Sequence, residues 1–262
     1  LIIMSGLGFV VWWDLWDKFQ KIIRGDLSPA RFFRVLRLQS KLVLTMTGIL
    51  VFAGAFLVFI FESRNPSTLK EAPLGTKIMA SFFQSVTTRT AGFYTIDQAL
   101  LSTPTVIVSL LWMFVGGSPM GTAGGIKTTT IAVLILSIAA YLQGKKDVEV
   151  YGRRIRESYL RSAMVVAGTS VLIIFGVSIL LSAVMPGTDL ADILYEITSA
   201  AATVGLSRGL TSQLNTAGKW IVILTMYLGR IGPLTMGTAV VVKVRNRPGS
   251  TTHLGEEDIM IG

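Results

Sequence analysis

Thr90-Ala91-Gly92-Phe93 is the stretch that decides how this chain folds, and Thr203-Val204-Gly205-Leu206 repeats it 113 residues later. Both have a threonine, a small or apolar residue, a glycine and an apolar residue in the same order. Residues 85–93 also align without gaps over residues 198–206, where small and hydroxyl-bearing residues prevail. Because glycine adopts backbone angles that are closed to other residues, both stretches indicate that backbone groups serve as ligands.

The composition of the chain is that of an all-α integral membrane protein. Its 262 residues are 51% hydrophobic and 15% charged, whereas a soluble domain has about 25% charged residues. The net charge is +9, but the basic residues alternate with membrane-length apolar runs, so we expect no nucleic-acid partner. Sixteen of the 24 basic residues fall in three segments between or after these runs. This pattern is typical of cytoplasmic loops.

The apolar segments have two lengths. Residues 42–61 and 162–185 are long enough to cross a bilayer, whereas residues 78–88 and 190–202 are not. Eleven helical residues rise roughly 16 Å, about half of the hydrocarbon core. Irregular backbone after such a half-helix lies at membrane depth, and this is tolerated only where it is buried in protein or lines a water-filled cavity.

The unit of spanning helix, half-helix, strand and spanning helix occurs twice, which predicts tandem pore repeats like those of potassium channels. The last helix, starting at 215–219, is expected to run to residue 242 with residues 229–233 inside it. The chain begins within an apolar run, so we expect that an earlier part of the natural protein precedes it. The expected parts are the end of a preceding repeat's last helix at 1–17, a cytoplasmic connector at 18–41, a pore repeat at 42–142, a connector at 143–161, a pore repeat at 162–242 and a cytoplasmic tail at 243–262.

The two repeated stretches are interpreted as strands of an ion selectivity filter. Potassium-channel filters have the form Thr-Val-Gly-Tyr-Gly, and the half-helix before each strand points its carbonyl end at a bound cation. Either motif alone is equally compatible with a chance turn in an outer loop, but two in equivalent places favour the filter. A ring needs about four strands, and this chain offers two. The predicted ion ligands are Thr90, Ala91, Gly92, Phe93, Thr203, Val204, Gly205 and Leu206.

Residues 116–125 hold five glycines and a proline, which cannot form a regular helix. A phosphate-binding loop is excluded because Ile126 stands where its second glycine must be. The segment is interpreted as a gating loop below the filter, and the alternative is a kinked helix packed by small residues. The predicted gate consists of Gly116, Gly117, Ser118, Pro119, Gly121, Thr122, Gly124, Gly125, Lys127 and Arg230.

Three charged residues in or next to the apolar segments need partners. Arg230 falls within an apolar segment, where a charge costs about 2.5–3.5 kcal/mol, so we expect it to face the pore as an electrostatic barrier or to be satisfied by carbonyls in a packing role. Lys127 either belongs to the same site or reaches cytoplasmic water. Arg89 is expected to bond a carboxylate or carbonyls behind the filter, and Glu196 is a candidate partner.

Residues 85–93, 116–129 and 227–233 together resemble the Trk/Ktr/HKT superfamily of potassium transporters, and the tail at 256–262 is most similar to that of the KtrB membrane subunit. The resemblance implies four helix–pore-helix–helix units, of which this chain is the C-terminal half. It further implies a homodimer with one pore per subunit and a cytosolic nucleotide-binding regulatory subunit of the KtrA/TrkA type. Gly92 and Gly205 would be the filter glycines of units three and four, residues 116–127 the intramembrane gating loop, and Arg230 the arginine below the filter.

The function expected from these features is gated, channel-like uptake of K⁺ across the cytoplasmic membrane, with Na⁺ as a coupling or activating ion and no organic cofactor. The alternative is a secondary transporter with discontinuous helices that couples a cation gradient to substrate movement. A membrane enzyme has little support, because the chain has one histidine, no cysteine and no paired intramembrane carboxylates.

Overall fold

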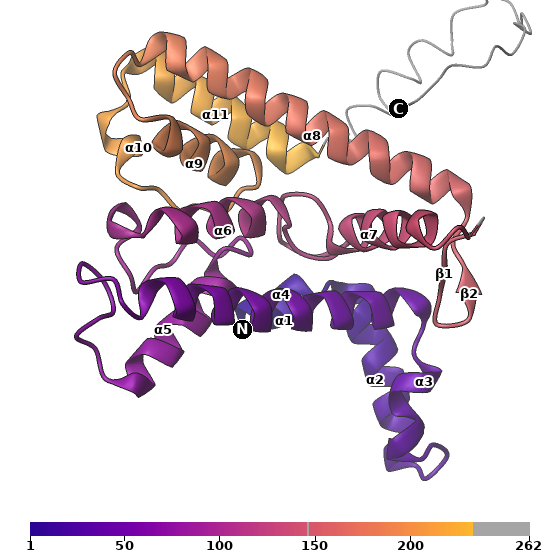
Figure 1. The fold of residues 1–262 in the computed structure, drawn as a ribbon. Coiled ribbons are helices and arrows are strands. Elements are labelled where there is room, and N and C mark those ends of the chain that lie inside the picture. The colour runs from indigo at the N-terminus through magenta and orange to yellow at the C-terminus, as the bar shows by residue number, and fades with distance from the viewer. Residues whose placement is uncertain (146, 233–262) are drawn as a thin grey trace, which may run out of the picture.

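The structure is a computed structural model that describes residues 1–145 and 147–232. The predicted tail at 243–262 and the end of the last predicted repeat lie outside the described residues. The described chain is helical, with one short hairpin (Figure 1). Its elements are α1 (Ile2–Gly6), α2 (Phe9–Ile23), η1 (Pro29–Arg31), α3 (Phe32–Val35), α4 (Leu38–Glu62), α5 (Leu74–Thr87), η2 (Gln98–Leu100), α6 (Thr103–Phe114), α7 (Thr128–Leu142), β1 (Glu149–Val150), β2 (Arg153–Arg154), α8 (Glu157–Val184), α9 (Leu190–Ala201), α10 (Leu210–Gln213) and α11 (Thr216–Ile231).

Two helices, α4 and α8, are long and apolar enough to cross a membrane. They contain the predicted crossing segments, and each begins a few residues earlier than expected, at Leu38 and Glu157. The apolar helices α6 and α7 are shorter and are separated by a loop at 115–127. The predicted interruption of this segment is therefore confirmed.

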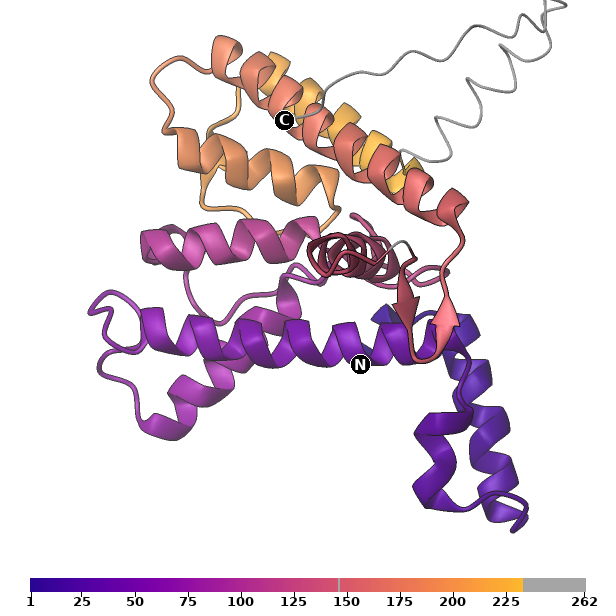
Figure 2. The same cartoon turned by 45° about the vertical axis from the view of Figure 1, so that its right-hand side comes forward.

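The two predicted half-helices are α5 and α9, which lie beside the long helices in Figures 1 and 2. Helix α5 packs mainly on α4, and α9 packs on α6, α8 and α11. The first turn of α9 is capped by Asp189, whose carboxylate accepts a hydrogen bond from the Ala191 amide. Both half-helices end directly before the repeated stretches.

Three helices meet with little space between them at Gly54 of α4. The indole nitrogen of Trp112 on α6 donates to the Leu50 carbonyl at 2.7 Å. The Ser85 hydroxyl of α5 donates to the Val51 carbonyl at 2.9 Å. A Cβ atom on Gly54 would overlap the Ser85 hydroxyl and lie 2.5 Å from the Trp112 nitrogen. Glycine at this position therefore lets the half-helix and α6 approach α4 together.

Three sequence predictions need correction. The first apolar run is not one helix, because Gly8 has φ +82° and separates α1 from α2. Helix α2 also continues to Ile23, beyond the expected boundary at residue 17. Its start packs on α4, where Val11 lies in one buried cluster with Val43, and its later part projects away from the long helices (Figures 1 and 2). The last helix ends at Ile231, and Gly232 with φ +83° lies outside it, so the predicted continuation through residue 232 is wrong; the predicted run from 233 to 242 lies outside the described residues.

The segment 143–161, predicted as a simple connector, contains the hairpin β1–β2. Its turn residues Tyr151 and Gly152 both have positive φ, as two-residue hairpin turns require. The Tyr151 hydroxyl shares a hydrogen bond of 2.8 Å with the Thr45 hydroxyl of α4. The hairpin therefore ties this connector to the beginning of α4.

Candidate functional site

The two repeated stretches share an unusual backbone. Thr90 has φ +64° and Gly92 has φ +76°, while Thr203 has φ +53° and Gly205 has φ +89°. A β-branched residue with positive φ is a genuine outlier and costs of order 1–3 kcal/mol. The same strain therefore occurs at the same position of both stretches. Such strain persists only where the surroundings enforce it, and it is concentrated at functional sites.

Residues 90–93 and 203–206 have irregular backbone with no β-ladder, and we call them the first and second strand. Each strand is tied back to the end of its own half-helix. The Ala91 amide donates to the Thr87 carbonyl at 3.1 Å, and the Val204 amide donates to the Ser199 carbonyl at 2.8 Å. Hydroxyl groups secure the far ends: the Thr87 hydroxyl donates to the Phe93 carbonyl, and the Leu206 amide donates to the Ser199 hydroxyl. These bonds hold the strained backbone in place.

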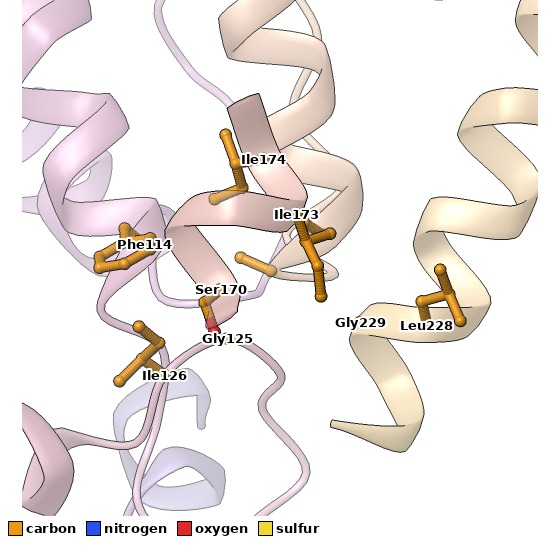
Figure 3. Close-up of a pocket in the computed structure, with 10 residues that line it drawn as sticks. Phe114, Gly125, Ile126, Ser170, Ile173, Ile174, Leu228 and Gly229 are labelled. Atoms are coloured by element: carbon orange, nitrogen blue, oxygen red, sulfur yellow. The ribbon is translucent and has the colours of Figure 1, made fainter. Parts of the chain in front are cut away.

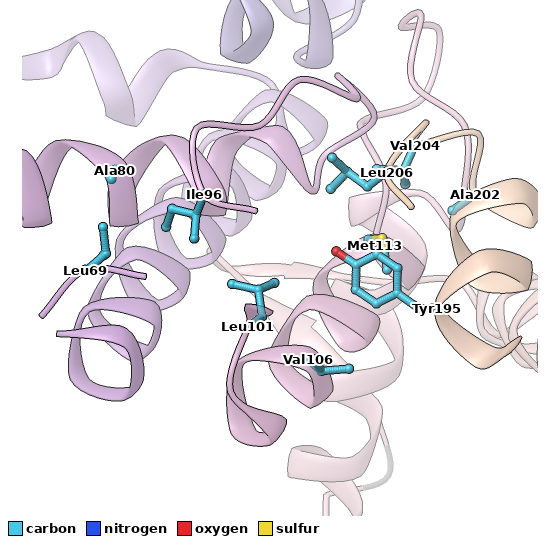
Figure 4. Close-up of a cluster of buried hydrophobic side chains, with 10 residues drawn as sticks. All are labelled: Leu69, Ala80, Ile96, Leu101, Val106, Met113, Tyr195, Ala202, Val204 and Leu206. Atoms are coloured by element: carbon cyan, nitrogen blue, oxygen red, sulfur yellow. The ribbon is translucent and has the colours of Figure 1, made fainter. Parts of the chain in front are cut away.

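The two strands approach each other at their glycines. A Cβ atom on Gly92 would lie 2.8 Å from the Val204 carbonyl oxygen and 3.3 Å from the Gly205 Cα. No side chain fits between them, so backbone meets backbone here. Because Val204 and Leu206 are buried, the side chains of the second strand point into the protein. They lie in a cluster with Met113 and Tyr195 (Figure 4).

The loop at 115–127 is an ordered structure and not a kinked helix. The Gly116 amide donates to the Ile126 carbonyl at 3.0 Å, and the Ile126 amide donates to the Phe114 carbonyl at 3.2 Å. The two ends of the loop are therefore paired side by side. The Ser118 and Thr128 hydroxyls, both buried, share a hydrogen bond of 3.0 Å.

This loop packs directly against the second strand. A Cβ atom on Gly124 would overlap the Thr203 hydroxyl and lie 2.6 Å from the Ala202 carbonyl oxygen. On its other side the loop contacts the beginning of the chain, where the Ser118 amide donates to the Gly6 carbonyl at 2.9 Å. The Gly-rich sequence is what allows these backbone contacts.

Both predicted gate cations bind carbonyl oxygens of the loop. Arg230 donates from Nη1 to the Thr122 carbonyl at 2.6 Å, and Lys127 donates from Nζ to the Ala123 carbonyl at 2.7 Å. Lys127 is half-buried and folds back onto the loop. The structure thus brings the predicted gate residues together, including two residues that lie 108 positions apart.

A small apolar cavity of about 40 Å³ lies beside the loop (Figure 3). Gly125 and Ile126 form its loop side, Ile174 contributes from α8, and Leu228 and Gly229 contribute from α11. The loop is therefore less closely packed on this side than against Thr203.

The suggested pairing of Arg89 with Glu196 is wrong. The Glu196 carboxylate accepts hydrogen bonds from the Ser207 hydroxyl at 2.7 Å and from the Thr211 hydroxyl. Arg89 is 4% exposed, and its Nη2 donates to the Thr47 hydroxyl at 3.4 Å. Glu196 thus fixes the backbone after the second strand, and Arg89 packs behind the first.

Two buried carboxylates were missed from the sequence, Asp14 of α2, which accepts from the Arg37 amide at 2.9 Å, and Glu62. Glu62, at the end of α4, accepts from the Ser102 amide at 2.9 Å, the Ser102 hydroxyl at 2.7 Å and the Asn65 side chain at 2.8 Å. It joins the loop after α4 to the start of α6. The available signal was a lone carboxylate at the end of a long apolar run.

These features define a helical membrane protein in which two half-helices deliver strained, glycine-centred strands to a common site and a loop packs against one of them. The chain belongs to the family described as "TrkH: Cation transport protein", which it matches over residues 1–247. It is a multi-pass protein of the cytoplasmic membrane.

Two curated relatives cover most of the chain. The "Ktr system potassium uptake protein B" of Bacillus subtilis is 40% identical over 235 residues, which are 90% of this chain and 50% of the relative. The "Potassium/sodium uptake protein NtpJ" of Enterococcus hirae is 37% identical over 265 residues, covering 100% of this chain and 56% of the relative. The chain therefore spans about half the length of these relatives, and its Ktr-like character is confirmed.

The fold is also that of a solved transporter. The crystal structure of the potassium transporter TrkH from Vibrio parahaemolyticus matches with a TM-score of 0.69 and 18% sequence identity, over 94% of this chain and 50% of that one. At this identity the match supports the helical transporter fold alone.

Proposed function

We propose that this chain supplies two strands of a selectivity filter and the gate of a potassium-uptake protein. The observation that carries the proposal is the paired backbone geometry at Thr90 to Gly92 and Thr203 to Gly205. A cation that sheds its water needs oxygen ligands from several sides, and backbone carbonyls supply them in a filter. The names of the Bacillus and Enterococcus relatives support K⁺ as the transported ion and Na⁺ as a second cation.

In this proposal the half-helices α5 and α9 direct their carbonyl ends at the ion. The partial negative charge at a helix C-terminus favours a cation, and both half-helices end where the strands face each other. Four such units form the ring, and two of them lie outside this chain. The complete protein is a homodimer with one pore per subunit, regulated by a cytosolic nucleotide-binding subunit of the KtrA/TrkA type.

The loop at 116–127 serves as the gate. It contacts Thr203 of the filter through Gly124, and Arg230 holds it through the Thr122 carbonyl. An arginine next to the cation pathway also raises the electrostatic barrier for ions. Opening requires the loop to leave the strand, and the small cavity beside Gly125 leaves space next to the loop on the side of α8 and α11.

A secondary transporter is the second candidate, because α6 and α7 form a discontinuous helix. The meeting of both half-helices at one pair of strands favours the filter, since inverted repeats would bring corresponding segments in from opposite faces.

The test is ion uptake by the full-length protein in potassium-uptake-deficient cells, with K⁺ and Na⁺ measured separately. Gly205→Ser places a side chain on a residue with φ +89°, and we expect it to lower the ratio of K⁺ to Na⁺ uptake. An unchanged ratio at equal protein levels would remove the filter assignment. Measuring uptake with and without the cytosolic subunit tests its role.

A further inference from the structure

Three buried polar side chains join the half-helices of the two repeats. Gln84 belongs to α5, Gln98 to the segment between the first strand and α6, and Tyr195 to α9. Gln84 and Gln98 exchange two hydrogen bonds, of 2.8 and 3.1 Å between amide nitrogen and amide oxygen. The Tyr195 hydroxyl donates to the same Gln98 oxygen at 2.8 Å. Gln98 is thus shared by both half-helices.

None of the three side chains reaches solvent in the described structure. Their exposed fractions are 0% for Gln84, 1% for Gln98 and 0% for Tyr195. The Gln98 nitrogen also donates to the Ile96 carbonyl at 2.5 Å, so the amide is held on both sides. A buried polar network in which every member is paired is rigid and specifies one arrangement, whereas a broken one leaves unpaired groups.

The network lies next to the filter strands without touching the ion site. Gln84 comes three residues before the end of α5 and is followed by the first strand. The Tyr195 ring packs in one cluster with Val204 and Leu206 of the second strand (Figure 4). A change at Tyr195 or Gln98 therefore alters the position of one strand relative to the other.

The network is specific to the junction of these two repeats. In the gapless alignment of the repeats, Phe82 corresponds to Tyr195 and Ile197 corresponds to Gln84. Phe82 is 37% exposed and has no hydroxyl, and Ile197 is apolar. The three contacts among Gln84, Gln98 and Tyr195 are therefore not repeated at the equivalent positions. The second repeat instead holds the segment after its strand to α9 through Glu196, which accepts from the Ser207 and Thr211 hydroxyls.

We propose that Gln84, Gln98 and Tyr195 are positioning residues that set the separation of the strands 90–93 and 203–206 and thereby the preference of the filter for K⁺ over Na⁺. The inference rests on the proposed filter. Carbonyl ligands discriminate between the two ions through their spacing and number, so a small shift of one strand changes discrimination before it changes total transport. None of the three residues belongs to the two strands that carry the proposed ion ligands.

Tyr195→Phe is the sharpest test, because it removes one hydroxyl and retains the ring that packs on the strand. In the full-length protein we expect the ratio of K⁺ to Na⁺ uptake to fall about fivefold at an unchanged protein level. Gln84→Met breaks the same network from α5, the other half-helix. If Tyr195→Phe does not accumulate in cells, the ratio of K⁺ to Na⁺ uptake in Gln84→Met tests the proposal. Tyr159→Phe, at a tyrosine that is 62% exposed on α8, is the matched control.

Combining Tyr195→Phe with Gln84→Met separates a shared role from two local ones. If both act through Gln98, the double variant lowers the ratio little more than either single change, since each already breaks the same network. A normal ratio in Tyr195→Phe and Gln84→Met, with only a lower melting temperature, would overturn the proposal. If Gly205→Ser still lowers the ratio in that case, the filter assignment stands while the positioning role fails.

Discussion

Gly92 and Gly205 face each other across the two strands: a Cβ atom on Gly205 would lie 3.4 Å from the Gly92 Cα, which is an ordinary contact. The reverse approach is closer, because a Cβ atom on Gly92 would lie 2.8 Å from the Val204 carbonyl oxygen. The two glycines of the proposed filter are therefore equivalent in backbone conformation and unequal in the space around them.

This inequality predicts different effects for the same substitution. Both Gly92→Ala and Gly205→Ala place an L side chain at positive φ, at a cost of roughly 1–2 kcal/mol. Gly92→Ala also pushes against the Val204 carbonyl, which is a candidate ion ligand. We expect uptake of K⁺ to fall at least about tenfold in Gly92→Ala and less in Gly205→Ala. Uptake rates at matched protein levels measure the difference.

Gly187→Ala is the control for the strain of a side chain at positive φ. Gly187 has φ +85° and nothing within 4 Å of its Cβ position, so this variant adds the strain without a steric contact. It should lower stability slightly and leave the ion ratio as it is. Equal losses of uptake in the two filter variants would show that the close approach at Val204 has no functional consequence.

The gating loop gives a prediction of opposite sign. Gly124→Ala forces the loop away from the Thr203 hydroxyl, and deletion within residues 118–124 removes the obstruction itself. We expect higher K⁺ flux from both, by a few-fold for the point change, since overpacking of this kind costs about 1–3 kcal/mol in the closed arrangement. Flux into proteoliposomes is the measurement.

Gly168→Ala on α8, with nothing within 4 Å, is the matched control for the loop variants. A fall in flux with intact protein levels would mean that the loop supports the filter and does not close it.

The strands and the loop could be predicted because their signals are local. A glycine at the third position of both repeated stretches, and five glycines between residues 116 and 125, restrict the backbone without reference to distant residues. The half-helices followed from the length of their apolar runs, which is also a local property. Helix α9 starts at Leu190 as predicted, whereas α5 starts at Leu74 and not at residue 78, since helix ends are set by local cap geometry.

The contacts that the sequence did not predict join distant segments. Arg230 binds the Thr122 carbonyl 108 positions away, and Tyr195 binds Gln98 across 97. Such hydrogen bonds do not repeat at helix or strand spacing, so the sequence pattern does not indicate them. Every residue has a backbone carbonyl, so the side-chain sequence cannot indicate that the carbonyl of Thr122 is the acceptor. The pairing of Arg89 with Glu196 failed for a different reason, because hydroxyl groups close to Glu196 in the sequence, such as that of Ser207, satisfy its carboxylate.

In the proposed gate Arg230 acts through a hydrogen bond, a charge or both, and two substitutions separate these. Arg230→Ala removes the 2.6 Å bond to the Thr122 carbonyl and the positive charge, so we expect flux to rise about tenfold. Arg230→Lys retains the charge without the guanidinium geometry. A rise only in the alanine variant assigns the effect to charge, and a rise in both assigns it to the hydrogen bond. No change in either variant would support a packing role for Arg230.

The position of the half-helix α5 depends on the close contact of α4, α5 and α6 at Gly54. Gly54→Ala places a methyl group on the Ser85 hydroxyl and near the Trp112 nitrogen, and we expect a loss of about 1–3 kcal/mol from overpacking. Gly48→Ala lies on the same helix with nothing within 4 Å, so it should gain up to about 1 kcal/mol of helix propensity. Thermal unfolding of both variants in detergent measures the pair. Because α5 leads into the first strand, we also expect Gly54→Ala to lower the ratio of K⁺ to Na⁺ uptake. Equal melting temperatures in the two variants would show that α5 and α6 can move away from α4 at Gly54 without a loss of stability.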